Sequence, residues 1–101
     1  MAEDLLRTET REIHVKGSGE TFAEAVQKCF GELRRKIYAQ ERHPLVYLEP
    51  VAFKVEKLER QTYTERFLEI LFPRVRERYV ITAIIEVLAK YVKLPDRLEE
   101  E

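Results

Sequence analysis

Three arginines, Arg74, Arg76 and Arg78, alternate along the chain and are the residues best suited to bind a ligand. Alternate residues of a β-strand lie on the same side, so three guanidinium groups would line one side of a strand there. Guanidinium groups match phosphates and carboxylates in shape and charge, and this predicts an anion site, placed at a subunit interface. The simpler alternative is that these arginines, with Arg60 and Arg66 opposite, pair across the strands with Glu65, Glu69 and Glu77, and both interpretations stay open.

Other chemically active side chains form no recognisable site. His14 and His43 are far apart in the sequence and have no companions at metal-ligand spacing, so we expect no metal. Cys29 falls within an apolar helical pattern, which favours a buried structural thiol over a nucleophile. Gly17-Ser18-Gly19 lacks the rest of a phosphate-binding fingerprint, so an ordinary strand-to-helix turn is expected. We therefore expect no catalytic residue and no cofactor, and the chain is predicted not to be an enzyme.

An apolar segment just before the arginines is the strongest sign of a partner. Hairpin turns normally face water and are polar, so an apolar turn at the end of a long hairpin indicates a contact with another chain. A second copy of the protein requires the fewest assumptions, and a membrane transporter is the other partner considered. The predicted interface consists of Phe67, Leu68, Ile70, Leu71 and Phe72.

The composition limits the possible partners and location. Charged residues make up 37% of the 101 residues, yet the net charge is only −1, so attraction to nucleic acid is not expected. The apolar runs are too short to insert directly into a membrane. The start of the sequence has no apolar leader, and a cytoplasmic location is expected.

The elements that must position these residues follow from periodicity. We expect a strand over residues 8–16 and a helix that begins after Thr21, with Glu24 completing a capping box. A strand over residues 51–67 and another over residues 75–92 follow. Glu49-Pro50 is expected to mark a bend or an edge position. The predicted apolar stripe of the helix consists of Phe22, Val26, Cys29, Phe30, Leu33 and Ile37.

The order β-α-β-β predicts an α+β fold. A right-handed crossover places the first two strands parallel, and the last strand inserts between them, which gives a three-stranded, mainly antiparallel sheet of order 1-3-2. One amphipathic helix should cover one face. The last strand is apolar on both faces, which predicts that it is covered on two sides. The chain is expected to be one domain, residues 1–101, with an ordered core over about 8–93 and frayed ends.

Element lengths predict a protruding arm. The helix should span about 27 Å, whereas uninterrupted strands of the hairpin would span about 55 Å. The helix can therefore cover only about half of the hairpin, and residues 58–80 are expected to project beyond it.

Two resemblances add expectations. The segments Val15-Lys16-Gly17-Ser18-Gly19, Leu48-Glu49-Pro50, and Tyr63-Thr64-Glu65-Arg66-Phe67-Leu68 with Phe72-Pro73-Arg74-Val75-Arg76 resemble a small family of uncharacterised bacterial cytoplasmic proteins. Its members are encoded beside two predicted integral membrane proteins and sugar-acid enzymes of the ketogluconate-phosphate aldolase type. The resemblance covers roughly residues 9–93 and implies an accessory role in carbohydrate uptake or use.

The β-α-β-β order also resembles the dodecin architecture, whose members assemble into hollow oligomers that bind flavin. The tryptophan that stacks on flavin there has no counterpart, because this chain has no Trp. The leading hypothesis is therefore a homo-oligomeric accessory protein without catalytic activity, linked to sugar-acid uptake or utilisation. The alternative is a module that binds an anionic metabolite at a subunit interface.

Overall fold

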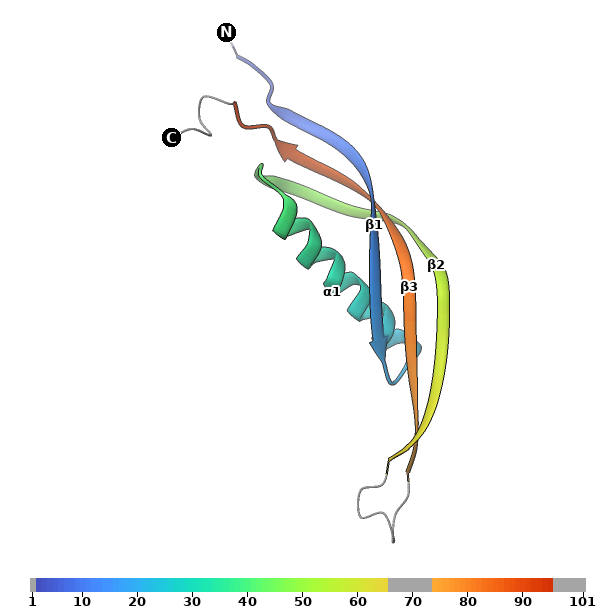
Figure 1. The fold of residues 1–101 in the computed structure, drawn as a ribbon. Coiled ribbons are helices and arrows are strands. Elements are labelled where there is room, and N and C mark those ends of the chain that lie inside the picture. Colours follow the sequence, from blue (N-terminus) through green and yellow to red (C-terminus); the bar gives the residue numbers. More distant parts are fainter. Residues whose placement is uncertain (1, 66–73, 96–101) are drawn as a thin grey trace.

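A computed structural model describes residues 2–65 and 74–95, with the side chains of all of these except 63–65, 74 and 75. It contains four elements: β1 (Leu6–Gly19), α1 (Phe22–Gln40), β2 (Leu45–Glu65) and β3 (Arg74–Val92). The helix lies beside a long curved sheet (Figure 1). The predicted turn residues 67–72 lie outside the described residues.

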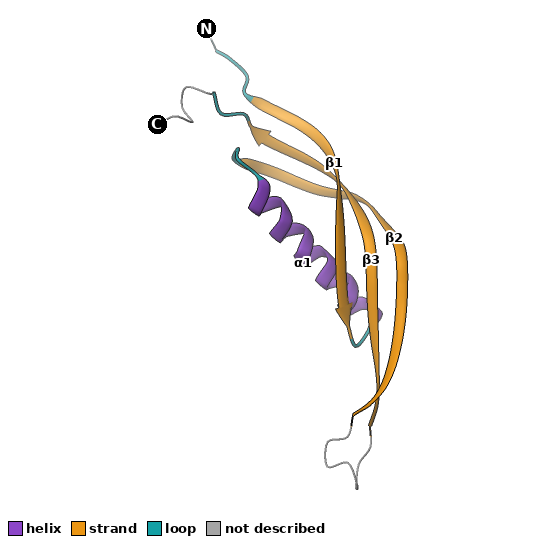
Figure 2. Ribbon diagram, in the orientation of Figure 1, coloured by secondary structure: helices purple, strands orange, loops and turns teal. Residues whose placement is uncertain are grey.

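The sheet confirms the predicted α+β topology. Its strand order is β1-β3-β2, and β3 pairs antiparallel with both neighbours. The pairing of β1 with β3 runs without interruption from Leu6 opposite Val92 to Gly19 opposite Tyr79. All three strands belong to one sheet, and α1 packs on it (Figure 2).

The helix begins where the sequence predicts. The side chain of Thr21 accepts a hydrogen bond from the backbone N–H of Glu24 at 3.1 Å, so it caps one of the unpaired donors of the first turn. The helix continues to Gln40, where the N–H of Glu41 still donates to the carbonyl of Ile37. Glu41 itself has an extended backbone, and this ends the helix.

The core lies between α1 and the two strands beneath it. Alternate residues of β3 point toward the helix and are fully buried, while β1 contributes Val15. The helix contributes residues at i, i+4, i+8 and i+12, which share one face. The buried set is Val15, Ala25, Cys29, Leu33, Ile37, Ile81, Ala83, Ile85, Val87 and Ala89.

Two strand boundaries differ from prediction. Gly17-Ser18-Gly19 does not break the first strand, because β1 runs through Gly19 and Gly17 brings it close to the helix backbone. The regular alternation was expected from Val51, whereas the second strand already begins at Leu45, and Pro50 lies inside it at the edge position that was predicted. Pro50 is tolerated because β2 is an edge strand and the register shifts between Pro50 and Ala52.

The longer first strand shortens the predicted arm. Because β1 pairs with β3 as far as Tyr79, only residues 61–65 and 74–78 form a two-stranded segment within the described part of the chain. These strands extend past the ends of β1 and α1 (Figure 1). The prediction that residues 58–80 project alone was therefore too long. The molecule is nonetheless elongated, with extents of 76 × 28 × 15 Å.

The expectation that β3 is covered on two sides was half right. It lies between two strands, and its helix-facing residues are buried. On the other face, Val80, Ile84 and Leu88 are only partly buried, because the described residues provide no second layer there. The apolar residues on this face therefore belong to a surface rather than to a core.

Candidate functional site

The helix covers only two of the three strands. Among the described residues, the backbone of α1 approaches β1 and β3 but does not come near β2. Val55 and Leu58 of β2 are paired with Ala83 and Ile81, so they lie on the helix side of the sheet. They are nevertheless 44% and 50% exposed, whereas Ala83 and Ile81 are fully buried. The helix side of β2 is therefore only partly covered: Leu45, Leu48 and Phe53 pack against the core, while Val55 and Leu58 stay exposed.

The helix adds aromatic residues to this surface. Phe22 lies two helical turns before Cys29 and shares its sheet-facing side, yet it is 46% exposed while Cys29 is fully buried. Phe30 stacks on Phe53 of β2 with ring centroids 5.5 Å apart. We call Phe22, Phe30, Phe53, Val55 and Leu58 together the β2 apolar strip.

This strip corrects the predicted helix stripe. The prediction placed Phe22 with the core residues and omitted Ala25, whereas Ala25 is fully buried and Phe22 is exposed. Phe22 is the first residue of α1, which starts after β1 has ended at Gly19, whereas Ala25 lies beside Gly17 and Gly19 of β1. Periodicity defines the apolar face of the helix but does not define how far the sheet extends beneath it.

The arginine ladder is paired within the chain. Arg76 donates to both carboxylate oxygens of Glu20, at 3.0 and 3.1 Å. Arg60 forms a cross-strand ion pair with Glu77, which also accepts a hydrogen bond from the hydroxyl of Tyr79 at 3.1 Å. The Arg60 hydrogen bond is the main cause that lowers the pKa of Glu77.

The three predicted ligand arginines therefore differ in their surroundings. The Arg74 side chain lies outside the described part of the structure, Arg76 is engaged by Glu20, and Arg78 donates to the hydroxyl of Ser18 at 3.0 Å. The cross-strand pairing of Arg60 with Glu77 agrees with the simpler interpretation. Glu20 was not foreseen as a partner, because it comes from the turn before α1, which lies 56 residues away in the sequence.

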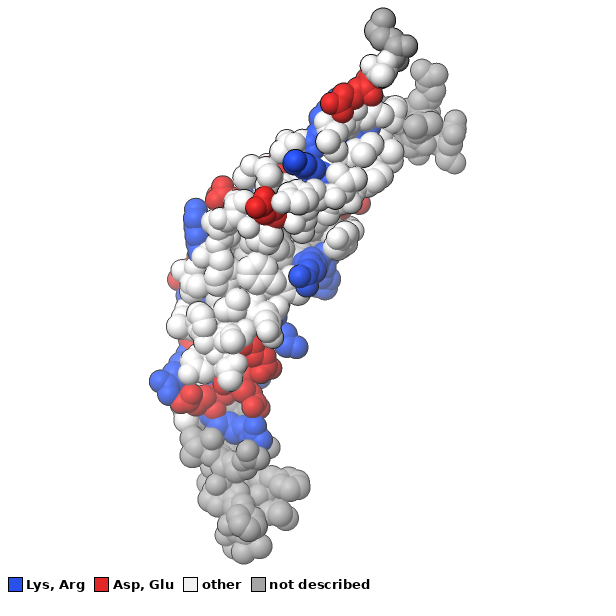
Figure 3. Space-filling view, turned by 180° about the vertical axis from the view of Figure 1, so that it is seen from behind, with Lys and Arg blue, Asp and Glu red and all other residues white. Residues whose placement is uncertain are grey.

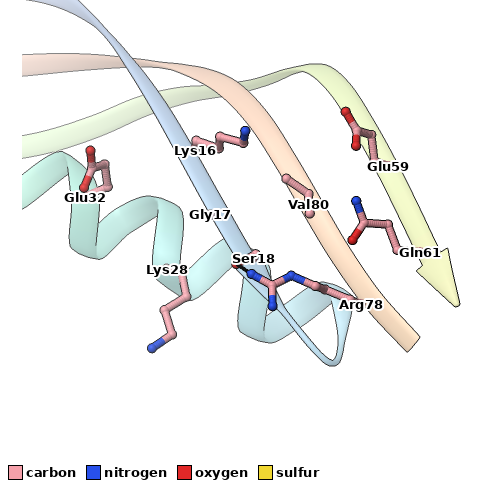
Figure 4. A pocket seen from close by; sticks show the side chains of 9 residues that line it. All are labelled: Lys16, Gly17, Ser18, Lys28, Glu32, Glu59, Gln61, Arg78 and Val80. Carbon is pink, nitrogen blue, oxygen red and sulfur yellow. Dashed lines mark hydrogen bonds between the residues drawn. The ribbon is translucent and has the colours of Figure 1, made fainter. Parts of the chain in front are cut away.

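A cavity of about 810 Å³ lies around Arg78. Its lining comes from all four elements, and Figure 4 shows the Arg78 guanidinium reaching Ser18 near the end of β1. Sequence reasoning found Arg78 but missed the lysines beside it, because β1 and α1 bring them there from distant positions. The lining residues are Lys16, Gly17, Ser18, Lys28, Glu32, Glu59, Gln61, Arg78 and Val80.

Charges of both signs surround the base of the arm. In the view of Figure 3, acidic and basic side chains lie next to each other just above the grey segment, and uncharged residues fill most of the middle of that face. This pattern agrees with the small net charge of −1. It also means that any anion site must be local rather than part of a broad basic surface.

The cysteine and histidines lie in separate places. Cys29 is buried, its Sγ is 3.9 Å from the carbonyl oxygen of Ile81, and desolvation raises its pKa. His14 lies 3.7 Å from the carboxylate of Glu56, while His43 Nδ1 accepts a hydrogen bond from the N–H of Leu94 at 3.0 Å. In the described ranges 2–65 and 74–95, no three His, Cys, Asp or Glu side chains gather as a metal site would require.

A second polar cluster fastens the end of the helix to the sheet. Arg11 of β1 lies 2.8 Å from the carboxylate of Glu41, whose side chain is only 8% exposed. The same guanidinium lies over the ring of Tyr91, and the His43 ring stacks on Tyr91 with centroids 5.5 Å apart. These groups are mutually engaged, and the cluster positions α1 rather than offering a binding site.

The described residues form the helix α1, and it is not long and apolar enough to cross a membrane.

Comparison with known proteins gives a family but no characterised relative. No curated protein and no solved structure matches the sequence. The sequence model of a family described as a domain of unknown function, DUF4312, matches residues 9–92. This span includes β1 from its fourth residue, all of α1 and β2, and β3 to its last residue. Because the match covers most of the chain, the protein belongs to the DUF4312 family.

Proposed function

We propose that this protein is a non-catalytic accessory subunit that assembles with further copies of itself through the β2 apolar strip. The observation that carries the proposal is the exposure of Phe22, Val55 and Leu58, at 46%, 44% and 50%, on the side of the sheet where the core lies. A water-facing surface of this kind, continuous with a core, is typical of a contact between proteins.

The accessible surface leaves room for an interface of standard size with a second copy. The accessible surface is 7717 Å². A compact monomer of this mass would expose about 6,000 Å². The excess is roughly 1,700 Å², about twice what each partner buries in a stable interface of standard size. The radius of gyration of 20.0 Å, against about 13 Å for a compact domain of this length, has the same origin.

The contact should be made by side chains rather than by pairing of edge strands. β2 has Pro50 inside it, and its register shifts in three places, between Leu45 and Tyr47, Pro50 and Ala52, and Val55 and Lys57. Both features disfavour the addition of a strand at that edge. Two strips packed face to face about a two-fold axis would instead bury Phe22, Val55 and Leu58 of each copy.

The experiment is analytical ultracentrifugation of the wild type and of Leu58→Glu. Leu58 is half exposed in the single chain, so the charge should not unfold the monomer. We expect the wild type to sediment as an oligomer and Leu58→Glu to sediment as a folded monomer with an unchanged circular dichroism spectrum.

Val46→Glu is the matched control, because Val46 is 56% exposed on the same strand but lies outside the strip. It should associate as the wild type does. A wild type that stays monomeric at millimolar concentration would overturn the proposal, and so would equal loss of association in both variants.

Two finer parts of this proposal come from the sequence. The apolar turn residues 67–72 lie outside the described residues and remain a predicted second contact, with another copy or with a membrane transporter. The link to carbohydrate or sugar-acid uptake comes from the family resemblance. The test is co-purification of the protein with the membrane proteins that are encoded beside members of the resembled family. If co-purification is lost in Leu71→Asp but kept in Leu58→Glu, the result would support a separate role for the turn.

A further inference from the structure

We propose that the cavity beside the end of β1 binds a small anion carrying two or more negative charges, of the phosphate class. This site lies within a single chain and differs from the predicted ladder of Arg74, Arg76 and Arg78. Of that ladder it includes only Arg78, which it combines with lysines from β1 and α1 (Figure 4).

The balance of charge in the lining is the first argument. Its cations are Lys16, Lys28 and Arg78, and its acids are Glu32 and Glu59. Both acids are already paired with cations outside the lining. Glu32 is 2.7 Å from Arg35 and 3.8 Å from Lys36.

Glu59 is neutralised in the same way by Lys57, at 2.8 Å. That hydrogen bond is the main cause of the lowered pKa of Glu59, and the charge of Lys16 is a lesser cause. The carboxylates therefore compensate little of the positive charge in the cavity.

Among the residues that the structure describes, the lining cations have no such carboxylate partners. Within the described residues, no carboxylate lies at ion-pair distance from Lys16, Lys28 or Arg78. In the part of the chain that the structure describes, Arg78 donates to the neutral hydroxyl of Ser18. Three cations around one cavity repel one another, so a bound anion would relieve that repulsion as well as form charge-assisted hydrogen bonds.

The types of donor favour phosphate. The Arg78 guanidinium presents a planar fork that matches two phosphate oxygens, while each lysine acts as a point charge. The Ser18 hydroxyl, which accepts from Arg78, keeps its own proton to donate, and the Gln61 amide in the same lining already hydrogen-bonds to Glu59. A ligand with a single charge would leave two of the three cations uncompensated, which is why a multivalent anion is proposed.

The test is isothermal titration calorimetry with pyrophosphate at low ionic strength. We expect saturable binding to the wild type, with acetate giving none. Arg78→Gln and Lys28→Gln should each weaken binding at least about tenfold, which is the effect of losing one charge-assisted hydrogen bond.

Lys54→Gln is the matched control, because it removes the same charge from the same sheet face outside the lining and should change affinity less than about twofold. Lys57→Gln should weaken binding although Lys57 does not line the cavity, because it leaves the Glu59 charge uncompensated. All four side chains are exposed, so unchanged thermal melts are expected and confirm folding. Absence of binding to the wild type would overturn the proposal, and so would a loss with Lys54→Gln equal to that with Arg78→Gln.

Discussion

Gly17 of β1 lies directly against the backbone of α1 at Cys29. A Cβ atom on residue 17 would stand 2.6 Å from the Cys29 nitrogen and 2.9 Å from its Sγ. No flexible side chain can move aside to make room, since backbone atoms form one wall. The close approach of helix and sheet at this point therefore depends on the absence of a side chain at Gly17.

The first prediction compares two glycines. Gly17→Ala should destabilise the protein by about 1–3 kcal/mol, the usual cost of forcing a methyl group into a filled core. Gly31→Ala should instead stabilise it by about 1 kcal/mol, because Gly31 lies in the middle of α1 with open space around its Cα and alanine favours the helix. Chemical denaturation of both variants measures the two effects. Stabilisation by Gly17→Ala, or destabilisation by Gly31→Ala, would contradict the packing described.

The second prediction concerns Cys29. The thiol is fully buried, and desolvation raises its pKa, so both accessibility and thiolate content are low. Modification by a disulfide reagent in native buffer should be at least about a hundredfold slower than in denaturant, in line with the open fraction of a stable core. A variant that carries Cys29→Ala with Ala39→Cys places the thiol on an exposed position of the same helix and should react at once. Rapid modification of Cys29 in the native protein would contradict its burial in the core.

The third prediction uses the pH dependence of the Arg11–Glu41 contact. Desolvation alone would raise the pKa of Glu41, but the Arg11 guanidinium at 2.8 Å and the N–H of His43 at 3.2 Å outweigh it and lower the pKa. A carboxyl whose pKa is lowered by folding stabilises the native state above its unfolded pKa, and that stabilisation is lost as the pH falls through the folded pKa.

Glu41→Gln should therefore cost about 1–3 kcal/mol of unfolding free energy near neutral pH and much less in acid. Glu9→Gln is the control, because Glu9 also contacts Arg11, at 3.2 Å, but is 46% exposed. It should change stability by less than about 0.5 kcal/mol. Urea titrations at neutral and acid pH distinguish the two. A Glu41→Gln effect that does not shrink in acid would argue against the ion pair.

The fourth prediction addresses a pair of like charges. Glu12 of β1 and Glu86 of β3 are direct cross-strand partners on the face of the sheet away from the helix. Glu12→Lys should raise stability by about 0.2–1 kcal/mol, because it replaces repulsion with attraction between opposed residues. The gain should shrink at high salt. Thermal melts at low and high salt provide the measurement, with Glu3→Lys as a charge-matched control outside the sheet. A loss of stability in Glu12→Lys would show that the repulsion is already relieved.

Local patterns in the sequence were sufficient for the elements and their order. The Thr21 cap, the helical spacing of Cys29, Leu33 and Ile37, and the alternation along β3 each depend on neighbours a few residues away. The strand order followed from connectivity and from the apolar character of the last strand. Boundaries were predicted less well, because Gly17 normally interrupts a strand and here does not, and β2 starts at Leu45, before its regular alternation begins.

The candidate surfaces needed contacts between distant residues. Nothing near Arg76 in the sequence indicates Glu20 as its partner, and nothing near Arg78 indicates Lys28. Phe22 also fits the apolar pattern of a core residue, and only the position of α1 over β1 and β3 leaves it exposed.

The sequence by itself therefore determined which residues form strands and helix and which face of each is apolar, since these follow from backbone geometry and periodicity. Only the tertiary structure decided which arginine keeps its charge available and which strand the helix leaves uncovered. Both depend on where an element lies across the sheet, and that is set by packing of the whole chain, with Gly17 allowing the close approach of α1 to β1.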